Sequence, residues 1–385
     1  MRLVLYELKK IFEGKRVLAV VVLSALQYLM FMSFLINPFQ HESLVLIWQE
    51  MIEDYGIEMN EADTIHFQQI LYERISAFEI ELAQRPEFVE RDVLTLEDFN
   101  YQMNYSQSFW DAFHNDPIIG LFREINDRYW LGFSIIGFFD EETNEIRAWL
   151  ETWVYEAEAQ RWEEVIARGT LSFFPYEVFN TYRVVITSIA FLTVSSLIIL
   201  ISPLYISERR DHMLTLQYSS KTGRSLFWKR IIAVSLAVVI VTTIHLLFTL
   251  AIYLQSPASW FLDFDMSSGL NTPMWYDITF RRFIFLTSAL VYLNGLLFAL
   301  ISLFISRLMP NYLTILGIKL PIVFAVISIS YFDFVVVDVI RARFDENFRF
   351  NPPHLMPLFY LFIVIIIAIL LFVQWKKEKK LDILL

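Results

Sequence analysis

Six long apolar stretches constrain the fold of this sequence more than any other feature. An α-helix needs about 20 apolar residues to cross the hydrocarbon core of a membrane. The six stretches are residues 17–36, 183–206, 231–254, 283–306, 312–337 and 357–374. The composition agrees, because 56% of the residues are hydrophobic, only 19% are charged and the mean hydropathy is +0.48. We therefore expect an all-α polytopic membrane protein with six transmembrane helices.

Basic residues predict which way these spans point, because short cytoplasmic loops are enriched in lysine and arginine. Residues 1–16, residues 207–230, Arg307 and the tail 375–385 together hold 16 of the 31 basic residues. An even number of spans places these four segments on one side of the membrane. We therefore expect both termini in the cytoplasm, with 255–282 and 338–356 as loops on the outer side.

The long segment 37–182, between the first two spans, falls on the outer side by the same reasoning. Residues 37–180 hold 29 acidic residues, eight arginines and no lysine, a balance of −21. A solvated surface explains this acidity most simply, and the alternative is a surface that attracts cations or a basic peptide. Two apolar stripes at helical spacing predict a helical extracytoplasmic domain with its own core, or else an aromatic ligand groove. One stripe runs from Phe67 to Leu82, before Pro86, and the other from Ile146 to Ile166, between Asp140 as N-cap and Gly169 as a stop.

Residues 1–16 predict an amphipathic helix in the inner membrane interface. Its apolar side chains fall within an arc of about 120° at roughly 100° per residue. They are Met1, Val4, Leu5, Leu8, Ile11 and Phe12, and Arg2, Lys9, Lys10 and Glu13 occupy the remainder. The alternative is an extension of the first span, which the seven charges among these sixteen residues disfavour.

The loop 207–230 has the composition of a docking surface for a cytoplasmic partner. An acidic residue follows the second span, and a short apolar edge and a basic turn come next. The residues that we assign to this contact are Glu208, Met213, Leu214, Leu216, Lys221, Gly223 and Arg224. An ordinary positively charged loop is the alternative.

The same loop resembles the first cytoplasmic loop of ABC transporter permeases of the type 2 exporter class. The resemblance rests on Glu208, the short apolar helix through Leu214, the run Ser219-Ser220-Lys221-Thr222-Gly223-Arg224, and Lys229. The six spans, the amphipathic start and the inward termini resemble the same family. Two features depart from it: His212 and Met213 stand where many relatives carry a glycine, and segment 37–180 is longer than the corresponding loop of most relatives.

The resemblance implies a permease subunit in the cell membrane of a bacterium. Its loop would act as a coupling helix seated on a separate ATP-binding cassette ATPase, which would bind ATP and Mg²⁺. A working unit would contain a second permease subunit, identical or different, and two ATPase subunits. The resemblance also implies export of a peptide or an amphipathic, lipid-like molecule. We expect contacts with membrane lipids and no nucleic-acid partner.

Motifs for catalysis by the chain itself are missing from the sequence. No phosphate-binding G-x-x-x-x-G-K-[ST] motif occurs, and the six histidines lack metal-ligand spacing. No G-x-S-x-G motif is present, and the chain contains no cysteine. We therefore expect no catalytic residue, no metal site and no cofactor in this chain, and we expect ATP hydrolysis only in a partner.

Four polar residues within the spans are candidates for a substrate path. Gln27, His245 and Asn294 lie near the middle of the first, third and fourth spans, and Lys319 lies about eight residues into the fifth. Polar residues there usually face other helices, so interhelical hydrogen bonds are the alternative for the first three. Lys319 can instead extend its amine toward the inner surface or pair with a headgroup phosphate.

Two other classes of function remain open. One is a membrane sensor or scaffold, whose outer domain binds a ligand and whose inner loop recruits a partner without transport. The other is an intramembrane enzyme, which the absence of paired catalytic groups disfavours. A neighbouring gene that encodes a phosphate-loop ATPase favours the transporter, and a neighbouring kinase alone favours the sensor.

Overall fold

The computed structural model describes residues 2–32, 42–139, 156–205, 208, 226–267, 274–308 and 355–381. Its regular elements in these ranges are helices. In addition, two isolated β-bridges each pair two extended residues. The chain divides into two compact units. We call one the bundle, Met1–Pro38, Glu177–Ser259 and Arg281–Leu385, and the other the insert, Phe39–Tyr176 and Trp260–Phe280. The all-α prediction is confirmed for the described residues.

Four helices of the bundle are long and apolar enough to cross a membrane, which identifies a membrane protein. They are α11 (Tyr176–Ile201), α14 (Leu226–Tyr253), α15 (Phe280–Leu308) and α18 (Leu355–Leu381). Each contains most of a predicted span, the second, third, fourth and sixth respectively. The first span begins as α2 (Gly14–Gln27) and a π-helical turn, Tyr28–Met32. The fifth, 312–337, lies outside the described residues.

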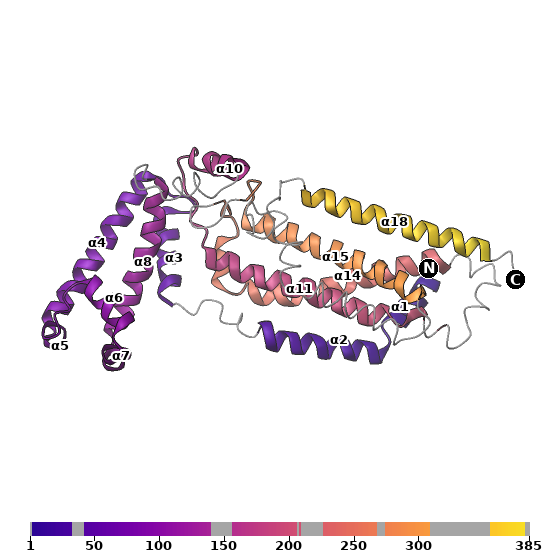
Figure 1. The fold of residues 1–385 in the computed structure, drawn as a ribbon, viewed down its shortest axis with the longest axis horizontal. Helices are drawn as coiled ribbons and strands as arrows, with labels where there is room; N and C mark the ends of the chain where they lie inside the picture. The colour runs from indigo at the N-terminus through magenta and orange to yellow at the C-terminus, as the bar shows by residue number, and fades with distance from the viewer. Residues whose placement is uncertain are drawn as a thin grey trace. The chain divides into compact units, whose positions relative to one another are not determined.

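Helix α11 is the central helix of the bundle. Within its most apolar 18 residues 67% are buried, against 17% for α18. Helix α14 runs antiparallel to it, because the Tyr253 hydroxyl at the end of α14 donates to the Val178 carbonyl near the start of α11 at 3.1 Å. Helix α15 runs parallel to α11, since Ser306 at its end donates to the carbonyl of Ser202, just past the end of α11, at 2.7 Å. Figure 1 shows these three helices side by side.

A glycine allows these three helices to approach closely. A Cβ atom on Gly295 of α15 would lie 3.3 Å from side-chain carbons of Leu197 and Thr193 on α11 and of Val238 on α14. Contacts of this length are tighter than ordinary van der Waals contacts. Small residues serve the same purpose at helix crossings in membranes, where close backbone approach supplies the packing energy.

The amphipathic segment at the start of the chain is shorter than predicted. Helix α1 is Arg2–Ile11, and α2 begins at Gly14 after Glu13 adopts an extended conformation, so Lys15 and Arg16 belong to α2. Ile11 is fully buried in the bundle core, with Val4 and Leu8 packed beside it. Leu5, at the other edge of the predicted apolar arc, is 58% exposed. The buried face of α1 is therefore rotated away from Leu5.

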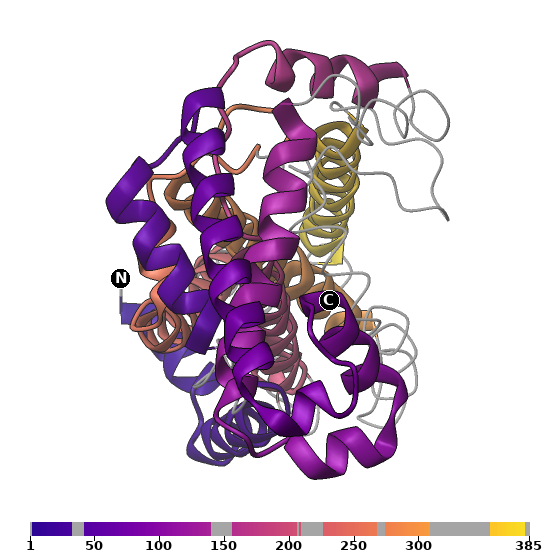
Figure 2. The same ribbon diagram turned by 90° about the vertical axis from the view of Figure 1, so that its left-hand side faces the viewer.

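The insert is built from seven described helices. Figures 1 and 2 show α4 and α8 running side by side, with the short helices α5, α6 and α7 at one end of the pair. The bounds are α3 (Glu42–Tyr55), α4 (Glu61–Gln84), α5 (Pro86–Val89), α6 (Leu96–Tyr105), α7 (Gln107–Phe113), α8 (Ile118–Phe139) and α10 (Glu156–Ile166).

The predicted stripe on α4 forms part of the insert core. Of its residues, Phe67, Leu71, Phe78 and Leu82 are buried and Ile70 and Ile75 are partly buried, and the helix ends before Pro86 as expected. Phe78 and Leu82 join a cluster rich in phenylalanine that includes Phe88, Phe99, Phe109, Phe113 and Phe122. Side-chain capping boxes at Asn60 and Thr95 start α4 and α6. In the second predicted stripe, Trp162 and Val165 are buried and Gly169 has a φ of 68°, whereas Ile146 lies outside the described residues.

A second stretch of chain completes the insert. Residues Trp260–Phe280 were expected to be only a loop, within 255–282, but they belong to the same compact unit as Phe39–Tyr176. Phe261 is fully buried and contacts the rings of Trp48 and Phe174 at centroid distances of 5.6 and 6.2 Å. The domain predicted as 37–182 is therefore made of two segments that are far apart in the sequence.

Candidate functional site

Four charged side chains form a buried cluster at the end of the bundle where α1 meets α14. Arg230, near the start of α14, donates from Nε to Glu7 Oε2 at 2.9 Å and from Nη2 to Glu208 Oε1 at 2.5 Å. Lys10 Nζ bridges the same two carboxylates, at 3.1 Å from Glu7 Oε1 and 2.9 Å from Glu208 Oε1. Glu7, Glu208 and Arg230 are each at most 5% exposed. The charged cluster, as we call these four residues, thus ties together three separate segments of the chain.

The charges in the cluster balance, and the pKa values of Glu208 and Lys10 shift in the directions that keep these two groups ionised. Burial by itself would raise the pKa of the Glu208 carboxyl, but its contacts with Arg230 and Lys10 outweigh burial and lower the pKa. Burial would likewise lower the pKa of Lys10, but its contacts with Glu208 and Glu7 raise the pKa. Both shifts favour the ion pairs. The Glu208 Oε2 atom nevertheless remains buried without a hydrogen bond from any described residue.

The cluster also explains the orientation of α1. Glu7 lies about 40° outside the predicted apolar arc at roughly 100° per residue. Turning Glu7 inward to Arg230 brings Val4, Leu8 and Ile11 against the bundle and turns Leu5 outward. Of the four residues, only Glu208 was predicted as a site residue, and Glu7, Lys10 and Arg230 were missed by sequence reasoning. The local signal is the spacing of Glu7 and Lys10, three residues apart on one helix face.

Each end of the predicted docking loop contributes one residue to the charged cluster. Glu208 is the residue before the part of the loop that lies outside the described residues, and Arg230 lies shortly after it. The guanidinium of Arg230 also lies over the ring of Tyr205, 4.4 Å from its centroid. Glu208 therefore directs its carboxylate into the bundle. The remaining docking residues, Met213, Leu214, Leu216, Lys221, Gly223 and Arg224, lie outside the described residues.

Two of the four candidate path residues meet in a groove of about 490 Å³ between α2, α11 and α14. Gln27 on α2 donates from Nε2 to the Ser188 carbonyl at 2.6 Å, and its Oε1 is buried without a hydrogen-bond partner among the described residues. The Nδ1 atom of His245, on α14, lies 3.3 Å from the hydroxyl oxygen of Thr193, on α11. The apolar groove, as we call it, is lined by Phe12, Val17, Val20, Val21, Ser24, Gln27, Tyr28, Leu192, Leu200, Ile240, Val241, Ile244, His245, Phe248 and Thr249.

A third candidate, Asn294, is not among the residues that line this groove. Asn294 on α15 is 2% exposed and donates to the Leu290 carbonyl at 2.9 Å and to the Tyr360 hydroxyl of α18 at 2.7 Å. The bond to Tyr360 matches the interhelical alternative, because it fastens α18 to α15, whereas the bond to Leu290 lies within α15. Lys319 lies outside the described residues.

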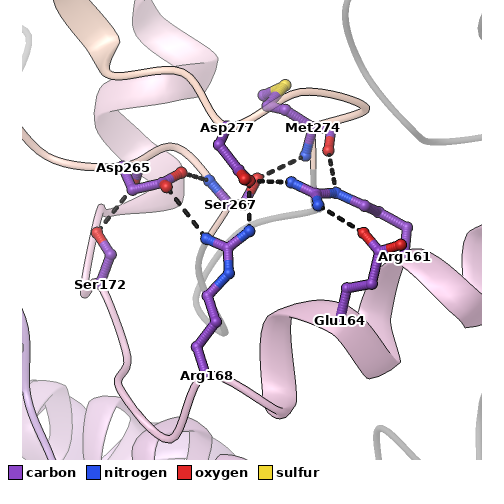
Figure 3. Close-up of polar contacts among 8 residues, drawn as sticks. All are labelled: Arg161, Glu164, Arg168, Ser172, Asp265, Ser267, Met274 and Asp277. Atoms are coloured by element: carbon purple, nitrogen blue, oxygen red, sulfur yellow. Dashed lines mark hydrogen bonds and ion pairs between the residues drawn. The ribbon is translucent and has the colours of Figure 1, made fainter.

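A second polar network lies in the insert and joins segment 260–280 to the end of α10 (Figure 3). Asp277 pairs with both Arg161 of α10 and Arg168, and Arg168 also reaches Asp265 Oδ2 at 3.3 Å. Arg161 donates from Nε to the Met274 carbonyl at 2.8 Å. This clasp, as we call Arg161, Arg168, Asp265 and Asp277, fixes the segment 260–280 to the end of α10.

The two carboxyls of the clasp have opposite pKa shifts. Burial would raise the pKa of Asp277, but hydrogen bonds from Arg161 and Arg168 lower it. For Asp265, burial raises the pKa, and the hydrogen bond from the Ser267 backbone N–H and the charges of Arg168 and Arg161 do not offset the rise. Both carboxylates are paired with arginine and join segment 260–280 to the end of α10, which is a structural role. Among the described residues no group of three or more His, Asp or Glu side chains is placed to hold a metal ion.

Comparisons of the chain with protein-family models, with curated proteins and with solved structures found no significant match.

Proposed function

We propose that this chain is the membrane-spanning permease subunit of an ATP-binding cassette exporter, driven by a separate ATPase that docks on the loop 207–230. The observation that carries the proposal is the charged cluster. Glu208 and Arg230 flank the docking loop and are joined to each other and to α1 through Glu7 and Lys10. A displacement of the loop by a partner would therefore move the adjoining ends of α11 and α14 together with α1.

The proposal includes six spans, with the termini in the cytoplasm and the insert on the outer side. Helix α15 ends beside the end of α11. Helix α18 runs toward the same end of the bundle. The ring of its Trp375 lies 6.2 Å, between centroids, from the ring of Trp228 at the start of α14, and α14 begins where α11 ends. Consecutive helices that point the same way need a connection that returns along the bundle. This need supports a further span at 312–337.

Cysteine accessibility tests this topology, because the natural chain has no cysteine to remove. We expect Glu90→Cys, at an exposed site in the insert, to react with a membrane-impermeant maleimide on intact cells. We expect Lys15→Cys, an exposed site in α2, to react only after the membrane is opened. The reverse pattern would contradict the proposed orientation.

Capture of the ATPase tests the function. The chain is purified from its native membrane with an affinity tag, and co-purified proteins are searched for a phosphate-loop lysine. Leu214→Asp should reduce capture at least about tenfold, since a few apolar anchors usually dominate an interface. Gln217→Asp is the matched control, because it adds the same charge to the same loop at a polar position. Equal capture by both variants would contradict docking on the apolar edge.

The same capture separates the transporter from its rival. A permease requires that the captured partner hydrolyse ATP and that the isolated chain have no ATPase activity. A captured partner without a phosphate loop, such as a kinase or a scaffold component, would instead favour the membrane sensor with the insert as its ligand-binding part. Robust ATP hydrolysis by the pure chain would contradict both.

A further inference from the structure

We infer that the apolar groove is a binding site for an uncharged, lipid-like molecule that carries a hydrogen-bond donor such as a hydroxyl or an amide N–H. This inference does not depend on transport. It rests on the groove and on the unused hydrogen-bonding capacity of two residues that line it.

An unsatisfied acceptor is the first argument. Gln27 is 4% exposed, its Nε2 is committed to the Ser188 carbonyl, and its Oε1 accepts no hydrogen bond. A buried acceptor without a donor costs about 1–3 kcal/mol. A ligand that donates to Oε1 would remove this cost, which gives the groove a reason to prefer molecules with a donor.

The second argument comes from His245, which lines the same groove. Its ring is 7% exposed, and its Nδ1 faces the Thr193 hydroxyl. That contact uses one nitrogen of the ring, and no hydrogen bond to a described residue uses Nε2, which is left for a ligand. The groove therefore offers two polar groups with unused capacity, from α2 and α14, in a mostly apolar lining that also contains Ser24, Tyr28 and Thr249.

The absence of charge sets the class of ligand. The lining residues include no aspartate, glutamate, lysine or arginine. A phosphate or carboxylate headgroup would lose its hydration there without gaining a counter-ion. An uncharged molecule with an apolar body meets no such cost, so charged lipid headgroups are excluded from the groove itself.

The exposed edge of the groove indicates how a ligand would enter. Val21 on α2 and Ile244 and Phe248 on α14 line the groove and are 57%, 60% and 60% exposed on the apolar surface of the bundle. In a bilayer this surface faces lipid, so a membrane-dissolved molecule reaches the groove sideways. The volume of about 490 Å³ falls in the range of about 300–1,000 Å³ that is usual for small-molecule sites.

Photolabelling of the full chain in lipid nanodiscs tests the inference. The probe is a long-chain alcohol with a diazirine on its alkyl chain, and its methyl ether, which cannot donate a hydrogen bond, is the matched comparison. We expect the alcohol to label peptides of α2 and α14, and we expect the ether to label them about fivefold less, a ratio that corresponds to about 1 kcal/mol for one hydrogen bond. Equal labelling by the two probes would overturn the inference, since it would indicate only bulk acyl chains at the surface.

Three variants locate the label and test its hydrogen bond. Ile240→Trp fills the groove and should abolish labelling, whereas Val239→Trp, at the neighbouring exposed position outside the groove, should leave it unchanged. Gln27→Leu removes the acceptor, so the alcohol should lose its advantage over the ether even where labelling persists. Labelling of Ile240→Trp at the level of Val239→Trp would place the probe elsewhere and overturn the inference.

Competition then distinguishes two sources of the same chemistry. Displacement of the alcohol probe by diacylglycerol supports a hydroxyl-bearing lipid of the bilayer as the occupant. Displacement only by a single-chain alcohol supports a smaller molecule that partitions into the membrane.

Discussion

Replacement of Arg230 by methionine is the perturbation that most directly tests the charged cluster. Methionine keeps an unbranched apolar side chain but removes the guanidinium that pairs with Glu7 and Glu208. These carboxylates are 2% and 5% exposed, so they cannot recover hydration in place. Lys10 remains within reach of both, and it then has to neutralise two carboxylates alone.

The expected cost follows from this geometry. Removing one partner of a buried ion pair destabilises a protein by about 3–5 kcal/mol. Because Lys10 continues to bridge the two acids at 3.1 and 2.9 Å, we expect the lower end, about 3 kcal/mol. For a folded unit of about 150–250 residues each kcal/mol lowers Tm by about 2–4 °C. The Tm of Arg230→Met should therefore fall by about 6–12 °C.

Thermal unfolding of the detergent-purified chain, followed by tryptophan fluorescence, measures this fall. Lys15→Met is the matched control, because it removes the same charge from an exposed position on α2, where a single charge is worth about 0–1 kcal/mol. The double variant Glu208→Gln with Arg230→Met should lose less stability than the two single variants added together, by about 0.5–3 kcal/mol, because their side chains interact. If Arg230→Met melted within about 1 °C of Lys15→Met, the argument that the cluster fastens α1 to α14 would be refuted.

Three further predictions concern packing and pH. Gly295→Ala should destabilise the bundle by about 1–3 kcal/mol through overpacking. Gly120→Ala is the control: the added Cβ meets nothing within 4 Å, so it should stabilise α8 by up to about 1 kcal/mol in the same thermal assay. A loss of stability in both variants would contradict the packing argument. Phe261→Ala should cost the insert about 3–5 kcal/mol, and hydrogen exchange should show the loss in the insert while α11 and α14 keep their protection; unchanged exchange in the insert would mean that segment 260–280 is dispensable. The Arg85 hydrogen bonds lower the pKa of Asp116 below its usual 3.8, so this pair stabilises the insert above about pH 4 and loses its effect as the pH falls through the lowered pKa. Asp116→Asn should therefore flatten that part of the acid dependence measured by circular dichroism, and an unchanged acid profile would count against the pair.

The sequence by itself determined the features that depend on one segment and its solvent. The length of an apolar run predicts a membrane span because a helix rises a fixed distance per residue, and four predicted spans correspond to helices of the structure. The stripe on α4 and its end before Pro86 were predictable for the same reason, since helical periodicity and the missing N–H of proline act over a few residues. The conformation of Gly169 after α10 is likewise a local property.

Only the tertiary structure decided which faces of these helices meet. The burial of Glu7 depends on Arg230, which a helical wheel of residues 1–16 cannot include. The wheel therefore placed Leu5, and not Glu7, on the buried face of α1. The meeting of Gln27 and His245 in one groove depends in the same way on how α2 packs against α14. Segment 260–280 joins the insert because Phe261 and Asp277 find partners on α3 and α10 that no local pattern encodes. Each of these contacts joins residues from separate segments, and its energy comes from burial and charge pairing that exist only after the chain has folded.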